Sequence, residues 1–373
     1  MKRRLACLLA LLVAAIPSRL HSQTYDVVIR HGRLVDGSGN PAFFADVAVK
    51  DGRIAAIGRI AGKAKTEIDA RGLIVAPGFI DVHTHADDVA EMPRAENFVR
   101  MGVTTIVAGN CGGSTLDVTQ DQYAYTASST GLSQLVPDWA LEGGRSEFRK
   151  RIADPAQKAA MVLDMKKNLR SKGREDYSYA VIASCKQDKS LDGLSIAEAA
   201  KAKRGADSLD DQIETVLAIQ ASGGASGVFH GMSEDDPKTF MRHPNTMIAC
   251  DSGLRKLGEG MPHPRGYGNN ARVLARYVRE LKVLRLEDAI RKMTSLPAST
   301  FHFKGRGELR EGNWADIVVF DPDKIQDNAT YMDPHHYATG IPYVLVNGIP
   351  VIKNGEHTGA KAGQALRHVC SPR

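Results

Sequence analysis

The sequence predicts an α/β protein in which a middle region of alternating strands and helices lies between two strand-rich chain ends. Short runs of alternating apolar residues, bounded by Gly, Asp and Asn, occupy residues 25–75 and 315–355. Between them, strand-like runs such as residues 104–108 alternate with helix-like stretches such as residues 270–284. Strands at both ends of an α/β chain indicate a small β-domain assembled from the two termini.

The first residues have the pattern of an export signal. Basic residues at positions 2–4 precede an apolar run over residues 5–16, which is too short to span a membrane. We therefore expect residues 1–22 to be a signal peptide that is cleaved near Ser22, and the mature protein to be periplasmic or secreted.

Charge and cysteine content exclude some classes of partner. The formal net charge of the whole chain is +6, and removal of a leader with four basic residues and no acid lowers it to +2. No basic tract remains, so we expect no nucleic-acid partner and no stable membrane anchor after cleavage. The remaining cysteines are too scattered for a disulfide framework, although a Cys185–Cys250 bridge stays open as an alternative.

Both strand-rich ends contain a clear hairpin. Asp51-Gly52 and, near the other end, Asn347-Gly348 each separate two apolar strand-like runs, and both dipeptides favour tight primed turns. The resulting division of the chain has a first β part, an α/β region and a second β part, over residues 23–75, 76–305 and 306–373.

The α/β region opens with a turn, Pro77-Gly78, and an apolar strand that ends in His83 and His85. Because side chains alternate across a strand, the two imidazoles point to the same side. That arrangement lets both bind one metal ion from a rigid element. The alternative is a pair of solvent-facing histidines, but the preceding Pro-Gly-Phe-Ile-Asp run favours a metal site.

Two further candidates follow apolar strands, which is where an α/β barrel presents its functional groups. Cys111 follows the strand over residues 104–108, and its thiolate is either a zinc ligand or a small buried turn residue. Asp251 follows the strand over residues 247–250, where it is either a metal ligand and proton acceptor or a turn or helix cap.

A strand is also expected over residues 116–125, followed by a polar loop. Tyr123 and Ser129 lie at its exit, as substrate hydrogen-bonding groups or as ordinary loop residues. Helical periodicity, with Ser208 as one cap, is expected over residues 150–171, 196–203, 208–220, 270–284 and 286–293.

These segments together resemble the amidohydrolase superfamily and, within it, the N-acyl-D-amino-acid deacylases, or D-aminoacylases. The similarity extends over nearly all of the mature chain, from about Tyr25 to about Arg367. The segments that carry it are residues 76–85, 102–112, 117–130, 251–253, 263–265, 293–298 and 315–322. The Asn110-Cys111-Gly112 piece favours this group over hydantoinase-like relatives, which use a carboxylated lysine.

The resemblance implies a TIM-type (β/α)8 barrel that depends on zinc, with a β-sandwich built from both chain ends. It also implies hydrolysis of the amide bond of a small-molecule N-acyl-D-amino acid to a carboxylate and a free D-amino acid. Asp251 matches the residue that takes the proton of the attacking water and passes it to the leaving amine. The positions that match zinc ligands are His83, His85, Cys111 and Asp251. The positions of expected substrate contact are Tyr123, Ser129 and Arg265.

One departure from the family pattern is large. In the family a long segment, with several barrel strands and two further histidine ligands, lies between the motifs that begin here at Cys111 and Leu116. This chain joins them almost directly and has no histidine between His85 and His230. The later candidates His230, His243 and His263 do not match the missing positions. We therefore expect an incomplete barrel, whose open sheet edges could be covered by oligomerisation.

Two alternatives to the deacylase remain. One is an amidohydrolase-fold enzyme that acts on another amide or on a cyclic amide. A panel of substrates would distinguish it from an N-acyl-D-amino-acid deacylase. The other is an inactive, internally deleted homologue that retains only a binding or assembly role. Four protein ligands around one zinc would close a tetrahedral site, so catalysis there would need a further position for water.

Overall fold

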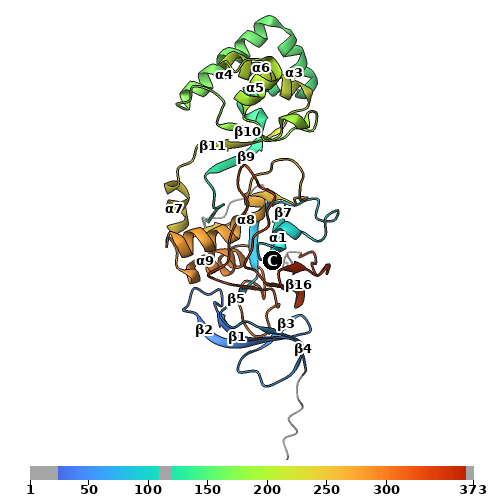
Figure 1. Cartoon of the computed structure of the whole chain (residues 1–373), viewed down its shortest axis with the longest axis vertical. Coiled ribbons are helices and arrows are strands. Elements are labelled where there is room, and N and C mark those ends of the chain that lie inside the picture. The colour runs from blue at the N-terminus through green and yellow to red at the C-terminus, as the bar shows by residue number, and fades with distance from the viewer. Residues whose placement is uncertain (1–23, 109–118, 367–373) are drawn as a thin grey trace, which may run out of the picture.

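The structure, a computed structural model, describes residues 24–108 and 119–366. Figure 1 shows an elongated molecule with three parts along its length: a β-sheet at one end, a mixed α/β centre, and a helical unit at the other end. The predicted signal peptide lies outside the described residues. Among the described residues, no helix combines the length and apolarity needed to cross a membrane.

Strands from both chain ends form one nine-stranded sheet, in the order β17-β16-β15-β14-β5-β1-β2-β3 with β4 beside β1. The two ends meet where β5 pairs antiparallel with β14, with Pro77 opposite Ile317. Whether this sheet folds into two layers, as the predicted sandwich requires, stays a prediction. The strands are β1 (Tyr25–Leu34), β2 (Phe43–Lys50), β3 (Arg53–Gly58), β4 (Ala64–Asp69), β5 (Ile74–Pro77), β14 (Ile317–Phe320), β15 (Tyr343–Val346), β16 (Ile349–Lys353) and β17 (Glu356–His357).

Both predicted hairpins are confirmed, and their turns have the backbone that the sequence requires. Asp51 and Gly52, between β2 and β3, have φ of 50° and 76°. Asn347 and Gly348, between β15 and β16, have φ of 49° and 80°. Positive φ at both central residues defines the type I′ turn, and Asp-Gly and Asn-Gly tolerate it best.

A buried ion pair fixes the second of these hairpins to the sheet. The side chains of Arg306 and Asp316 form an ion pair in which each is only 5% exposed. Asp316 also accepts a hydrogen bond from the backbone N–H of Asn347 at 2.8 Å, and Arg306 donates to the side-chain oxygen of Asn347 at 2.7 Å.

We expect Asp316→Ala to lower the free energy of unfolding by about 3–5 kcal/mol, because it leaves the Arg306 charge buried without its partner. Urea unfolding measures this difference. Asp323→Ala, at an exposed carboxylate of the neighbouring loop, is the control and should leave the midpoint nearly unchanged. Equal losses in the two variants would contradict the assignment.

The α/β centre contains two small parallel sheets. One has the order β13-β6-β7 and the other pairs β12 with β8. The described part of the α/β centre thus has five strands in parallel pairs and not a closed eight-stranded ring. Their bounds are β6 (Phe79–His85), β7 (Val103–Ala108), β8 (Gln120–Gln122), β12 (Thr246–Ile248) and β13 (Ser252–Gly253).

Close packing joins β6 to β7 at Gly78. A Cβ on Gly78 would lie 2.2 Å from Oγ1 of Thr104, so only glycine lets the two strands approach here. Helices cover this centre, with Phe79, Phe98 and Tyr277 among the fully buried side chains. They are α1 (Glu96–Val99), α7 (Asp235–Arg242), α8 (Arg265–Arg272), the π-helix η3 (Val273–Glu280), α9 (Leu286–Met293) and α10 (Ser295–Thr300).

The helical unit, residues 127–230, has its own antiparallel sheet, β10-β11-β9, and its own apolar core (Figure 1). Its core includes Phe148, Met161, Met165, Tyr177 and Ile213. Its elements are β9 (Ala127–Gly131), η1 (Leu132–Leu135), α2 (Asp138–Leu141), α3 (Gly144–Ala153), α4 (Pro155–Ser171), β10 (Ala180–Ser184), η2 (Lys189–Leu191), α5 (Ile196–Arg204), α6 (Leu209–Ser222) and β11 (Ser226–His230).

Several predicted elements are corrected in detail. The helix predicted over residues 150–171 is two helices, because the Asp154 side chain caps a new helix that starts at Pro155. The helix predicted over residues 270–284 begins earlier, at Arg265, and changes to a π-helix at Val273. The loop expected after residue 125 contains a strand, β9. The predicted Ser208 cap is confirmed.

The Cys185–Cys250 disulfide, which the sequence left open, is not present. Cys185 and Cys250 are both free and buried, in separate apolar clusters.

Candidate metal centre

The candidate site lies at the carboxyl ends of the parallel strands. His83 and His85 end β6, and Asp251 follows β12 and precedes β13. Parallel pairing of β13 with β6 places Ser252 opposite Thr84, so Asp251 lies directly beside the histidine pair. The strand ends of an α/β sheet are where such folds present polar groups to a ligand.

The backbone of Asp251 fixes its side chain in this position. Its N–H donates to the carbonyl oxygen of His83 at 2.9 Å. Its φ is 49°, in the left-handed region that few residues other than glycine adopt. Backbones of this kind cost free energy and cluster at functional sites, where surrounding structure holds them in place.

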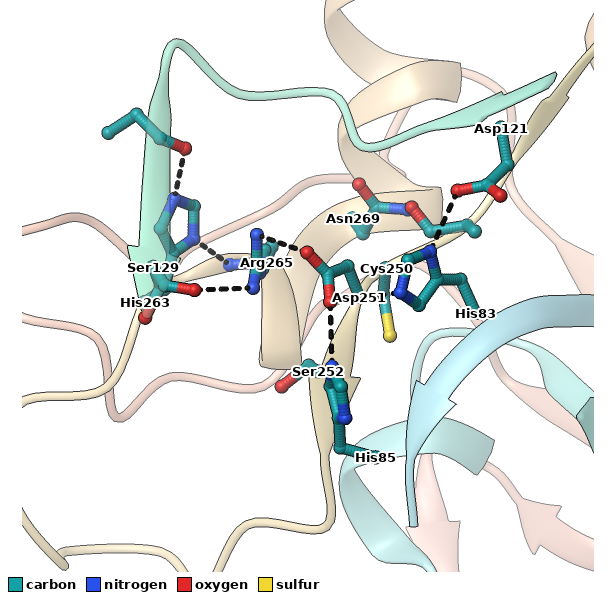
Figure 2. Close-up of polar contacts among 12 residues, drawn as sticks. His83, His85, Asp121, Ser129, Cys250, Asp251, Ser252, His263, Arg265 and Asn269 are labelled. Atoms are coloured by element: carbon teal, nitrogen blue, oxygen red, sulfur yellow. Dashed lines mark hydrogen bonds and ion pairs between the residues drawn. The ribbon is translucent and has the colours of Figure 1, made fainter. Parts of the chain in front are cut away.

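Both imidazoles face the same carboxylate oxygen (Figure 2). Nε2 of His85 lies 3.0 Å from Oδ1 of Asp251, and Nε2 of His83 lies 3.5 Å from that oxygen. The His85 side chain is 65% exposed, so the cluster is open to solvent. The alternation of side chains along β6 predicts this arrangement, and the structure has it.

These three residues fit a metal ion. One ligand atom from each lies within 4.8 Å of the other two, and no other group of this kind occurs in the described part of the chain. In a tetrahedral zinc site with bonds of about 2.0–2.1 Å, ligand atoms lie roughly 3.3 Å apart. Two imidazoles and a carboxylate are acceptable zinc ligands, so both the spacing and the donor chemistry agree.

Asp81, which the sequence did not indicate as a site residue, holds the backbone of the site through hydrogen bonds. It is fully buried and accepts hydrogen bonds from the backbone N–H of Cys250, at 3.1 Å, and of His83, at 3.2 Å. Burial raises the pKa of Asp81 to about 6. Asp81 thus ties β6 to the segment that delivers Asp251. Burial also raises the pKa of the Cys250 thiol well above its usual range, which keeps this cysteine protonated.

Arg265 brings together the predicted substrate-contact residues. This buried side chain places one guanidinium nitrogen 3.0 Å from Oδ2 of Asp251. Its other terminal nitrogen donates to the carbonyl oxygen of Ser129 at 3.4 Å (Figure 2). The guanidinium also lies over the ring of Tyr123, 4.4 Å from the ring centroid. Burial raises the pKa of Tyr123, so its phenol stays neutral and can donate a hydrogen bond.

The later histidines do not complete the metal cluster. None of His230, His243 and His263 belongs to it in the described residues, as the sequence predicts. His263 is buried, accepts a hydrogen bond from the Arg265 N–H at 3.0 Å, and donates from Nε2 to the carbonyl oxygen of Ala127 at 2.9 Å. Burial holds the pKa of His263 well below its usual range, so this ring stays neutral and serves as a structural bridge.

Cys111 lies outside the described residues, and its role as a ligand stays a prediction. The described chain stops at Ala108, which pairs with Thr84, the residue between the two histidines. A second residue that the sequence analysis missed is Asp121, whose carboxylate lies 3.2 Å from Nδ1 of His83.

Comparison with known proteins agrees with this geometry. The model of the amidohydrolase family matches residues 256–352. The D-aminoacylase of Alcaligenes xylosoxydans xylosoxydans is 28% identical, over 94% of this chain and 99% of the relative. The N-acyl-D-glutamate deacylase of the same organism is also 28% identical, over 93% and 97%.

Solved structures show the same fold. A D-aminoacylase structure with a binuclear metal centre covers 92% of this chain and all of that protein, at a TM-score of 0.68 and 24% identity. The N-acyl-D-glutamate deacylase from Bordetella bronchiseptica, complexed with zinc and a phosphonate inhibitor, has a TM-score of 0.62 and 27% identity over 88% and 97% of the two chains. The chain is therefore similar along nearly its whole length to D-aminoacylases, and part of it matches the amidohydrolase family.

The amidohydrolase-type α/β fold class and the resemblance to the D-aminoacylases are thereby confirmed. These relatives belong to the predicted class of hydrolases acting on carbon–nitrogen bonds other than peptide bonds. The alignment of this chain with the first relative spans 489 positions, more than the 373 residues of the chain. The relative thus has residues inside the matched span that this chain lacks. An internal deletion has this effect, and its location between Cys111 and Leu116 stays a prediction.

Proposed function

We propose that this amidohydrolase hydrolyses the amide bond of N-acyl-D-amino acids at a zinc site that includes His83, His85 and Asp251. The observation that carries the proposal is the convergence of these three side chains within 4.8 Å, at the strand ends of a chain that aligns with D-aminoacylases almost end to end. Cys111 is the proposed fourth ligand. A zinc ion bound there supplies Lewis-acid polarisation of the acyl carbonyl and of the attacking water.

The protein's own contribution to the reaction centres on Asp251. Its Oδ1 faces the imidazoles, while Arg265 holds Oδ2. The carboxylate takes one proton from the attacking water as the C–O bond forms. It then gives that proton to the amide nitrogen as the C–N bond breaks, so the products are a carboxylate and the free amine of the D-amino acid.

Substrate binding is assigned to the side of Asp251 where Arg265 lies. The buried guanidinium of Arg265 and the partly buried, neutral phenol of Tyr123 are donors for the carboxylate of an N-acyl amino acid. Ser129 lies on the neighbouring strand β9, where its carbonyl holds Arg265. The proposed partner is therefore a small acylated amino acid.

A substrate panel tests the proposal. Purified protein loaded with zinc is incubated with N-acetyl-D-methionine, its L-enantiomer, a dipeptide and a hydantoin, and amino-acid release is measured. We expect release from the D-substrate, loss of release after chelation, and recovery on adding zinc. Faster hydrolysis of the hydantoin or the L-enantiomer would favour a different amidohydrolase reaction. Tight zinc binding without any turnover would identify an inactive homologue with a structural zinc.

We further propose that the protein is exported to the periplasm or secreted. The basic and apolar pattern of residues 1–16 supports this. Amino-terminal sequencing of protein recovered from the periplasmic fraction should begin near Gln23. Recovery of the chain from the cytoplasm with residues 1–22 intact would contradict export.

A further inference from the structure

We propose that Asp121 positions His83 for metal binding by accepting a hydrogen bond from Nδ1 of that ring. This inference rests on the proposed metal site. The two atoms, Nδ1 of His83 and Oδ1 of Asp121, lie 3.2 Å apart, while Nε2 of the same ring faces Asp251 (Figure 2). A proton on Nδ1 leaves Nε2 with its lone pair free for the metal.

The backbone places Asp121 in this position. Strand β8 pairs in parallel with β12, with Asp121 opposite Met247, and the pairing continues through the N–H of Ala249, which donates to the carbonyl oxygen of Gln122 at 3.0 Å. The same segment then reaches Asp251. The carboxylate that contacts Nδ1 and the one that faces Nε2 are therefore held by one pair of strands.

The neighbours of Asp121 have partners away from the histidine. The side-chain amide of Gln120 donates to Oγ1 of Thr246 at 2.7 Å, and that of Gln122 donates to the carbonyl oxygen of Pro237 at 3.0 Å. Because side chains alternate along β8, Asp121 faces the site while Gln120 and Gln122 face away from it.

Asp121 has no ion pair with a lysine or arginine in the part of the chain that the structure describes; its ion-pair partner there is His83. Asp121 is therefore not a surface carboxylate that a nearby cation neutralises. A carboxylate that accepts the second N–H of a metal-binding imidazole fixes the ring's orientation and tautomer and makes the ligand nitrogen more basic.

The first test measures zinc affinity by competition with a chromophoric chelator. We expect Asp121→Ala to weaken binding about 10- to 100-fold. Asp121→Asn keeps an acceptor oxygen without the charge and should lose less. Gln122→Ala, on the same strand and opposite face, is the matched control and should bind zinc as the unchanged protein does. Equal affinity of Asp121→Ala and the unchanged protein, or equal losses in Asp121→Ala and Gln122→Ala, would overturn the inference.

The second test reads the tautomer of His83 by 15N NMR in the metal-free protein at about pH 9, above the ordinary histidine range. We expect the proton on Nδ1, and appearance of the Nε2-protonated form in Asp121→Ala. A proton on Nε2 in the unchanged protein would overturn the inference. The NMR measurement keeps the two proposals distinguishable. A protein that binds no zinc would contradict the proposed function. The tautomer of His83 in the metal-free protein would still test the role of Asp121.

Discussion

Asp251→Asn is expected to abolish measurable release of D-amino acid, with kcat lowered about 10²- to 10⁴-fold. The asparagine amide has nearly the shape of the carboxylate but cannot take a proton from the attacking water. It also leaves Arg265, which lies 3.0 Å from Oδ2, without its negative partner. The measurement is the initial rate of N-acetyl-D-methionine hydrolysis at saturating substrate and fixed zinc.

The same substitution at another carboxylate provides the control. Asp235 is 87% exposed on α7 and pairs with Lys238, so Asp235→Asn should retain full activity. Release that survives in Asp251→Asn would remove Asp251 from the mechanism, even if the zinc site itself remained intact.

Joint replacement of His83 and His85 by alanine is expected to remove bound zinc. Loss of a residue that only supports a ligand costs about 10- to 100-fold in affinity, so loss of two ligands should cost far more. The measurement is the zinc content of the dialysed protein by elemental analysis. His31→Ala, at a half-exposed ring in β1 that pairs with Asp69, is the control. Zinc retained at one ion per chain in the double variant would place the metal elsewhere.

Local signals predicted those parts of the fold that depend on a few neighbouring residues. Asp51-Gly52 and Asn347-Gly348 required turns with positive φ, and both are present. The break at Asp154-Pro155 carried an equally local signal, a capping aspartate before a proline, that the sequence analysis did not use. The separate core of the helical unit joins residues from distant segments, such as Phe148, Ile213 and Phe229, in one apolar cluster, which periodicity cannot show.

The residues of the site also fall into those that the local sequence indicates and those that only folding brings together. His83 and His85 are set by alternation along one strand, and Asp251 follows another strand, so the sequence and the family pattern located all three. Asp81 and Asp121 act through hydrogen bonds to residues brought near by folding. Nothing in their local sequence distinguishes them from ordinary strand carboxylates.

The pairing of β9 with β11 brings the two ends of the helical unit side by side. Ala127 lies opposite His230, so the chain leaves the α/β centre and returns to it across a single strand spacing of about 4.8 Å. The helical unit contacts the site through its main chain. The carbonyl oxygens of Ala127 and Ser129 accept hydrogen bonds from the side chains of His263 and Arg265, respectively. A graft from a relative would therefore need to preserve the backbone path of β9.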